Sequence, residues 1–342
     1  MTENFDLIRA QADMHQQYFI GLQLMVSTRE GPEASREWVF ELFRTQHEDK
    51  FLSSFRKLGL EGLPDAVASA QYHVLSNTIG GVGVEFMRES DTKAWVRYRY
   101  PRWWLEGPAV CGIPDEAGEG FMRGWHANNG MSLGNPRLGF VCVSEDMTGE
   151  YGFCGYFKEF DHDLAEEDRL QYAKHERPPA FDPTAQPAPP AAEWDEARLA
   201  KANRNYAIEF VRNGVMALTR TLGRERAVEL GVLTGKLTGL QQYTHLAKAV
   251  GASDGDASDA ARFLAAMFEG MGDDAEITAS ATGVAVTQSG LRIVRGLDGD
   301  DRHDLLRCWC EVWKGTIASH RAFMNVEVAE NGDRLLWNVA EA

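Results

Sequence analysis

The sequence predicts an α+β fold built from two similar units. Helical periodicity is followed by hairpin-like strands, this order repeats, and a proline-rich stretch separates the copies. That stretch, residues 175–194, holds six of the twelve prolines in the chain. Proline neither continues a helix nor donates to a sheet, so we interpret the stretch as a linker. We expect a first α+β unit at 1–174 and a second, diverged copy at 195–342.

The first unit opens with helices. Between Phe40 and Leu58, apolar side chains recur at spacings of three and four, which is typical of an amphipathic helix. Strand-like runs then alternate with one more helix. The expected elements are helices over residues 4–22, 40–58 and 64–77, strands over 82–87 and 94–100, a helix over 115–129, and strands over 138–143 and 151–157.

The second unit repeats this order. Its expected elements are helices over 196–222, 224–250 and 256–270, strands over 277–281 and 284–294, a helix over 302–318, and strands over 322–328 and 335–339. Asn331-Gly332 favours a hairpin turn, because both residues tolerate positive φ. Since the strands come as hairpins, we expect an antiparallel sheet with helices on one face in each unit, and an internal duplication.

Composition limits the classes of partner. Hydrophobic residues make up 44% of the chain, enough for packed cores, and the net charge of −16 argues against nucleic-acid or anionic-membrane partners. The N-terminal residues do not match a secretory signal, and the five cysteines form no CxxC pair, as expected of reduced thiols. We therefore expect a cytoplasmic protein with a small-molecule substrate or ligand, and a homodimer as a further possibility.

The established cofactor motifs are missing from the sequence. It contains no P-loop, no GxGxxG after a strand, no GxSxG and no HExxH, so we expect no cofactor. Cys308 and Cys310 with His303 come nearest to a metal site. Residues two apart on a helix diverge, so we favour buried thiols and expect no metal.

The stretch after residue 124 is the first candidate site. His126 is a natural proton carrier near neutral pH, and Asn128 and Asn129 could orient or polarise a carbonyl group. The structural alternative is that Asn129-Gly130 simply ends a helix. Cys154, placed near Gly152 and Gly155 in a strand, is a further catalytic candidate, although no sequence neighbour would lower the pKa of its thiol.

An aromatic and basic segment is the second candidate. Strand alternation places Arg97 and Arg99 on one face and Tyr98 on the other, with Trp103 following. Arginines beside large rings suit a carboxylated, partly aromatic ligand. Alternatively, the tyrosines are core residues and the arginines pair with acids such as Glu85.

The end of each half resembles a known family. Gly149-Glu150-Tyr151-Gly152-Phe153-Cys154-Gly155 in the first half and Gly332-Asp333-Arg334-Leu335-Leu336-Trp337-Asn338 in the second are similar to a closing Gly-Asp-Asp-Tyr-Cys-Asp-Phe motif. This motif belongs to the L-2-amino-thiazoline-4-carboxylic acid hydrolase-like family, which is similar to vinyl-reductase-type small-molecule-binding domains. The resemblance implies a small-molecule pocket and ring-opening hydrolysis, with the first half as the active one, because Leu336 stands where the cysteine would be.

The leading hypothesis is therefore a small-molecule hydrolase. His126 would act as acid or base, an asparagine would polarise the reacting centre, and Arg97 and Arg99 would position a carboxylated substrate. The alternative is a non-catalytic small-molecule-binding or sensor module. A purely structural partner protein is the third interpretation.

Overall fold

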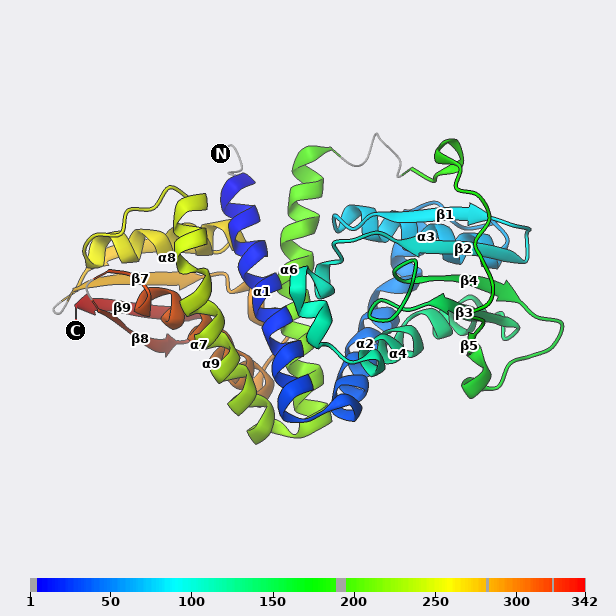
Figure 1. The fold of residues 1–342 in the computed structure, drawn as a ribbon. Helices are drawn as coiled ribbons and strands as arrows, with labels where there is room; N and C mark the ends of the chain where they lie inside the picture. Colours follow the sequence, from blue (N-terminus) through cyan, green and yellow to red (C-terminus); the bar gives the residue numbers. More distant parts are fainter. Residues whose placement is uncertain (1–4, 189–194, 281–282, 322, 342) are drawn as a thin grey trace. The chain divides into compact units, whose positions relative to one another are not determined.

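The computed structural model describes residues 5–188, 195–280, 283–321 and 323–341 (Figure 1). The chain divides into two compact units, Val26–Asp195 and Met1–Met25 with Glu196–Ala342, here called the central and the terminal unit. The predicted first unit, 1–174, includes the first helix, whereas contacts group residues 1–25 with the second half. Among predicted elements, Asn4, Ala281, Ala322 and linker residues 189–194 lie outside the described residues.

The central unit combines helices with a five-stranded sheet of order β1-β2-β4-β3-β5. All neighbouring strands are antiparallel except β3 and β5, which are parallel. Its helices are α2 (Pro32–Lys57), α3 (Asp65–Ile79), α4 (Asp115–Gly124) and α5 (Asn129–Leu133), and its strands are β1 (Val84–Arg88), β2 (Lys93–Tyr98), β3 (Leu138–Ser144), β4 (Cys154–Glu159) and β5 (Leu170–Tyr172). Helix α3 packs along β1, β2 and β4 and defines the helix face of the sheet.

Helices α2 and α4 approach closely because α4 carries glycine at the crossing. A Cβ atom on Gly120 would lie 2.4 Å from the carbonyl oxygen of Arg36, and one on Gly124 would lie 2.7 Å from that of Phe40. Any larger residue would have to push the two backbones apart. This contact fixes the end of α4, which leads directly into the segment that holds His126.

The predicted helix over residues 115–129 does not continue beyond residue 124. Helix α4 ends at Gly124, a 3₁₀ turn covers His126–Asn128, and α5 follows. The side-chain amide of Asn128 donates to the carbonyl oxygens of Arg123 and Gly124, which caps α4. Gly130 does not end the helix, because it lies within α5, where a Cβ atom would lie 2.5 Å from the carbonyl oxygen of Leu138. The left-handed residue that ends α5 is Gly134.

The terminal unit has a four-stranded antiparallel sheet of order β6-β7-β9-β8. Its helices are α1 (Phe5–Arg29, as far as Met25), α6 (Glu196–Leu222), α7 (Arg224–Ala249), α8 (Ala257–Met271) and α9 (Gly299–Ala318), and its strands are β6 (Asp274–Ala279), β7 (Val284–Ser289), β8 (Met324–Asn331) and β9 (Arg334–Glu341). Helix α1 is tied to this unit by the Tyr18 hydroxyl, which donates to the carbonyl oxygen of Gly231, and by His15, whose Nε2 accepts from the Trp309 indole.

Helices α7 and α9 are also packed through glycine. Gly231, Gly235 and Gly239 recur every fourth residue on α7 and all face α9. A Cβ atom on Gly239 would lie only 2.0 Å from the carbonyl oxygen of Val312. In each unit, therefore, a helix between the second and the third strand (α4 or α9) lies against the backbone of an earlier helix.

The predicted α+β class is confirmed, with mainly antiparallel sheets beside many helices. Both sheets share the strand order first, second, fourth, third, while β5 is found only in the central sheet. The duplication itself stays a prediction. Among the described helices, none is long and apolar enough to cross a membrane.

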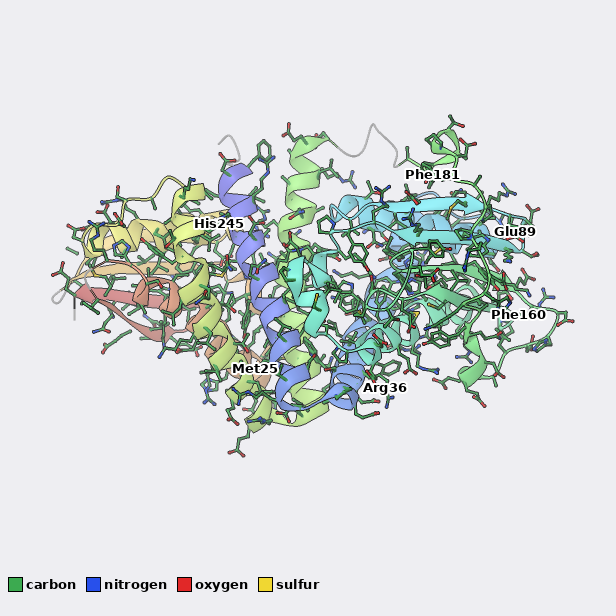
Figure 2. All side chains as sticks on the ribbon, viewed as in Figure 1. Met25, Arg36, Glu89, Phe160, Phe181 and His245 are labelled. Atoms are coloured by element: carbon green, nitrogen blue, oxygen red, sulfur yellow. The ribbon has the colours of Figure 1, made fainter. Side chains whose placement is uncertain are left out.

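The outer face of the central sheet, opposite α3, is covered by the chain that follows β4. Phe160 and Ala173 pack on an apolar cluster that includes Trp95 and Tyr156. Figure 2 labels Phe160 and Glu89 at the same end of this sheet. The side chain of Gln186 bonds both the backbone N–H and the C=O of Phe86 at 2.8 Å, in place of a neighbouring strand. The edge strand β1 is thereby capped at this residue.

Candidate functional site

A chain of buried polar side chains lies on the helix face of the central sheet. The Tyr98 hydroxyl oxygen lies 2.9 Å from Nδ1 of His73 and 3.1 Å from Nε2 of His126. Asn129 extends the chain, because its Nδ2 lies 3.3 Å from Nε2 of His73 and its Oδ1 lies 3.2 Å from Nε2 of His47. We call these five side chains the polar chain.

Five elements bring the polar chain together. His47 and His73 lie on the buried sides of α2 and α3, and Tyr98 ends β2. His126 follows α4 directly and Asn129 begins α5. Because strand side chains alternate between faces, Tyr98 points toward the helices while its neighbours point away.

The imidazoles of the polar chain are uncharged at neutral pH. Burial lowers the pKa of His47 to about 4 and that of His73 to about 3. For His126, burial and then the neighbouring His73 and Arg102 lower the pKa well below its usual value. The rings of His73 and His126 stack with centroids 4.1 Å apart, so a proton on one disfavours a proton on the other.

His126 is the end of the polar chain, and its Nδ1 atom is buried with no hydrogen-bond partner among the described residues. The side chain is 1% exposed, and aromatic rings surround it, with centroids 4.6 Å away for Phe140, 4.7 Å for Phe121 and 5.3 Å for Phe153. Leaving a buried polar group unpaired costs about 1–3 kcal/mol, so such an atom requires an explanation.

A buried ion pair lies beside the polar chain. Arg102 pairs with Asp146, and both side chains are 2% exposed. The guanidinium carbon of Arg102 lies 4.5 Å from the ring centroid of Tyr98 and also faces Phe153. The Tyr100 hydroxyl donates to the same aspartate at 3.0 Å. The positive charge next to the histidines is therefore compensated by Asp146.

The predicted catalytic residues do not all meet. His126, Asn129 and Tyr98 belong to the polar chain, whereas Cys154 lies in the apolar cluster on the outer face of the sheet. Burial raises the pKa of the Cys154 thiol to about 12, the opposite of what a nucleophile needs. Asn128 is occupied in capping α4.

The predicted substrate-binding arginines share one carboxylate. Arg97 and Arg99 bind the two oxygens of Glu85 at 3.1 Å and 2.7 Å, as the structural alternative expected. Arg97 also donates to the carbonyl oxygen of Tyr151. Trp103 is buried in a 3₁₀ turn that precedes α4. These arginines lie away from His126, because Arg97 and Tyr98 point to opposite faces.

A second, more open feature is a hollow of about 120 Å³ between the turn after β3 and the residues Lys174 and Arg177 that follow β5. Its charges are balanced, since Lys174 pairs with Glu145 and Arg177 lies 3.7 Å from Glu150. Within the described residues, no group of histidine, cysteine and acidic side chains could hold a metal ion.

Sequence reasoning named neither His47 nor His73 as a site residue. A signal was present: His47, His73 and His126 each stand within apolar stretches of the same half of the chain. A buried imidazole needs polar partners, so several such histidines suggest that they bind one another.

Comparisons with protein-family models, curated proteins and solved structures found no significant match to this chain.

Proposed function

We propose that the central unit binds a small, flat, uncharged molecule against His126 and does not convert it. The observation that carries this proposal is the unpaired Nδ1 atom of His126, buried among aromatic rings at the end of the polar chain. An apolar site with one or two fixed polar groups is the usual composition of a small-molecule pocket. A bound molecule that pairs with Nδ1 would remove the cost of leaving that atom unsatisfied.

The charges around His126 favour an uncharged ligand. The three imidazoles are neutral, Arg102 is paired with Asp146, and the predicted arginines are paired with Glu85. A carboxylate placed here would lose its hydration, and no unpaired cation would be there to bind it. Burying such a charge is costly. This replaces the predicted carboxylated ligand with a neutral one.

Two observations favour binding over hydrolysis. A strongly lowered pKa makes His126 a weak base, and Cys154 lies on the other face with its own pKa raised. Acid–base catalysis works best with a pKa near the operating pH.

Binding requires the aromatic rings around His126 to move. The ring centroids of Phe121 and Phe140 lie within 4.7 Å of the His126 ring centroid, so a ligand would have to displace some of these side chains.

The experiment uses quinoline, a neutral bicyclic compound, and benzoate as the charged counterpart. Histidine signals in NMR spectra of the ¹⁵N-histidine-labelled chain report contact with His126, and mass spectrometry reports conversion. We expect quinoline to shift the His126 signals and to be recovered unchanged, with no shift from benzoate. The His126→Phe variant should lose the response, and Cys154→Ala, on the opposite face, should keep it. Contact with neither compound, or turnover that Cys154→Ala abolishes, would refute the proposal, and the latter would favour the hydrolase.

A further inference from the structure

The hydrogen bonds of the polar chain can run in either of two opposite directions, depending on which ring nitrogens carry the protons. Each imidazole is neutral and carries one N–H, so one ring nitrogen donates and the other accepts. The Tyr98 hydroxyl bridges His73 and His126 and has a single proton, so the arrangement that leaves this buried proton paired donates to one imidazole and accepts from the other. If the direction reverses, Nδ1 of His126 changes from a donor to an acceptor.

Asn129 sets the direction. Its oxygen can only accept and faces Nε2 of His47, so His47 donates from that atom. Its NH₂ group can only donate and faces Nε2 of His73, so His73 carries its proton on Nδ1. An amide cannot exchange these roles without turning its end over.

The proton position on His73 fixes the remaining hydrogen bonds of the polar chain as far as His126. The Nδ1–H of His73 donates to Tyr98, and the Tyr98 hydroxyl then donates to Nε2 of His126. His126 must therefore carry its proton on Nδ1, the unpaired atom. The buried group offered to a ligand is an N–H donor.

We propose that Asn129 is the positioning residue that determines ligand class, making the site select hydrogen-bond acceptors such as a carbonyl oxygen or an unprotonated ring nitrogen. This inference rests on the proposed binding function. Asn129 does so without touching the ligand, through His73 and Tyr98. A ligand whose only polar group is an N–H would meet another donor and leave both unpaired.

The first test is independent of any ligand. In ¹⁵N NMR spectra of the full-length chain, the two tautomers of imidazole give different nitrogen shifts. We expect the proton on Nδ1 for His73 and His126, and on Nε2 for His47. A proton on Nε2 of His126 would overturn the role of Asn129, although the binding site itself could stand.

The second test compares quinoline, whose ring nitrogen accepts, with indole, whose ring N–H donates. We expect quinoline to bind about tenfold more tightly than indole, the usual worth of one buried hydrogen bond. Leucine cannot orient the hydrogen bonds of the polar chain. In Asn129→Leu, His126 should therefore show mixed tautomers, and quinoline and indole should bind with about equal affinity. Cys154→Ala is the control and should keep both the single His126 tautomer and the preference for quinoline.

Equal binding of the probes by the unaltered chain, or an unchanged tautomer in Asn129→Leu, would contradict the inference. Failure of both probes to bind would contradict the proposed function instead. If Asn129→Leu does not fold, the tautomers and the probe preference of the unaltered chain still decide.

Discussion

Mild acid should unfold the central unit selectively. A histidine whose pKa is lowered in the folded state binds fewer protons there than in the unfolded chain. The stability that it contributes is complete above about pH 6.5 and is lost as the pH falls toward the folded pKa. His47, His73 and His126 all belong to this class.

The size of the effect follows from the pKa values. One pKa unit corresponds to about 1.4 kcal/mol, so three such histidines together remove about 4 kcal/mol of unfolding free energy per pH unit below 6.5. From pH 6.5 to pH 5 the loss is about 5 kcal/mol, because the unfolded histidines are already half protonated at pH 6.5, and this is comparable with the whole stability of many domains.

The terminal unit provides an internal control. Its buried His15, with a pKa lowered to about 4, loses stability in the same range, by about 2 kcal/mol at pH 5. Asp273 acts in the opposite direction, because burial raises its pKa to about 6. An acid with a raised folded pKa contributes stability at low pH that is lost as the pH rises through 6, so acidification to pH 5 returns about 1 kcal/mol. The net change in this unit is small.

Urea unfolding at pH 7, 6 and 5, followed by hydrogen-exchange mass spectrometry, separates the two units by their peptides. The midpoint for peptides of Val26–Asp195 should fall steeply, while that for Glu196–Ala342 should change little. His126→Phe should lower the slope of the central unit by about one third. A central midpoint that is constant between pH 7 and pH 5, or a larger change in the terminal unit, would refute the reasoning.

Three substitutions test the packing and the buried pairs by denaturant unfolding. Gly239→Ala should destabilise the terminal unit by about 1–3 kcal/mol or more, since its Cβ meets a carbonyl oxygen of α9 at 2.0 Å, whereas Gln241→Ala on the exposed side of α7 should change little. Asp146→Ala should cost the central unit about 3–5 kcal/mol, because it leaves the buried Arg102 unpaired; a loss below about 1 kcal/mol would contradict this. Gln186→Leu should speed hydrogen exchange at Phe86, and unchanged exchange there would show that the cap is dispensable.

Local patterns predicted much of the fold. The apolar spacing of Phe40 to Leu58 identified α2, and the Asn331-Gly332 turn identified the hairpin of β8 and β9. The role of Gly120 could not be predicted, because its close contact is with the backbone of Arg36, which is distant in sequence, whereas Gly130 lies against the nearby Leu138. The end of α4 was missed although its cap is local, since the capping side chain of Asn128 lies within the stretch that was predicted to be helical.

The candidate site was predicted in part. His126, Asn129 and Tyr98 were all named as site residues, and the structure joins them in one polar chain. Cys154 was grouped with them for its glycine neighbours and its place in the closing motif, whereas the pleat of β4 turns it to the other face. His73 contributes through α3, and no spacing in the sequence relates that helix to the others.

By itself, the sequence determined the α+β class and the residue types that can exchange protons and hydrogen bonds. These properties depend on periodicity and on side-chain chemistry, both of which are local. Only the tertiary structure decided which of those groups meet, which are neutral and which lacks a partner. Burial and pairing depend on residues that are brought together across the fold, and at His126 both act on the same imidazole ring.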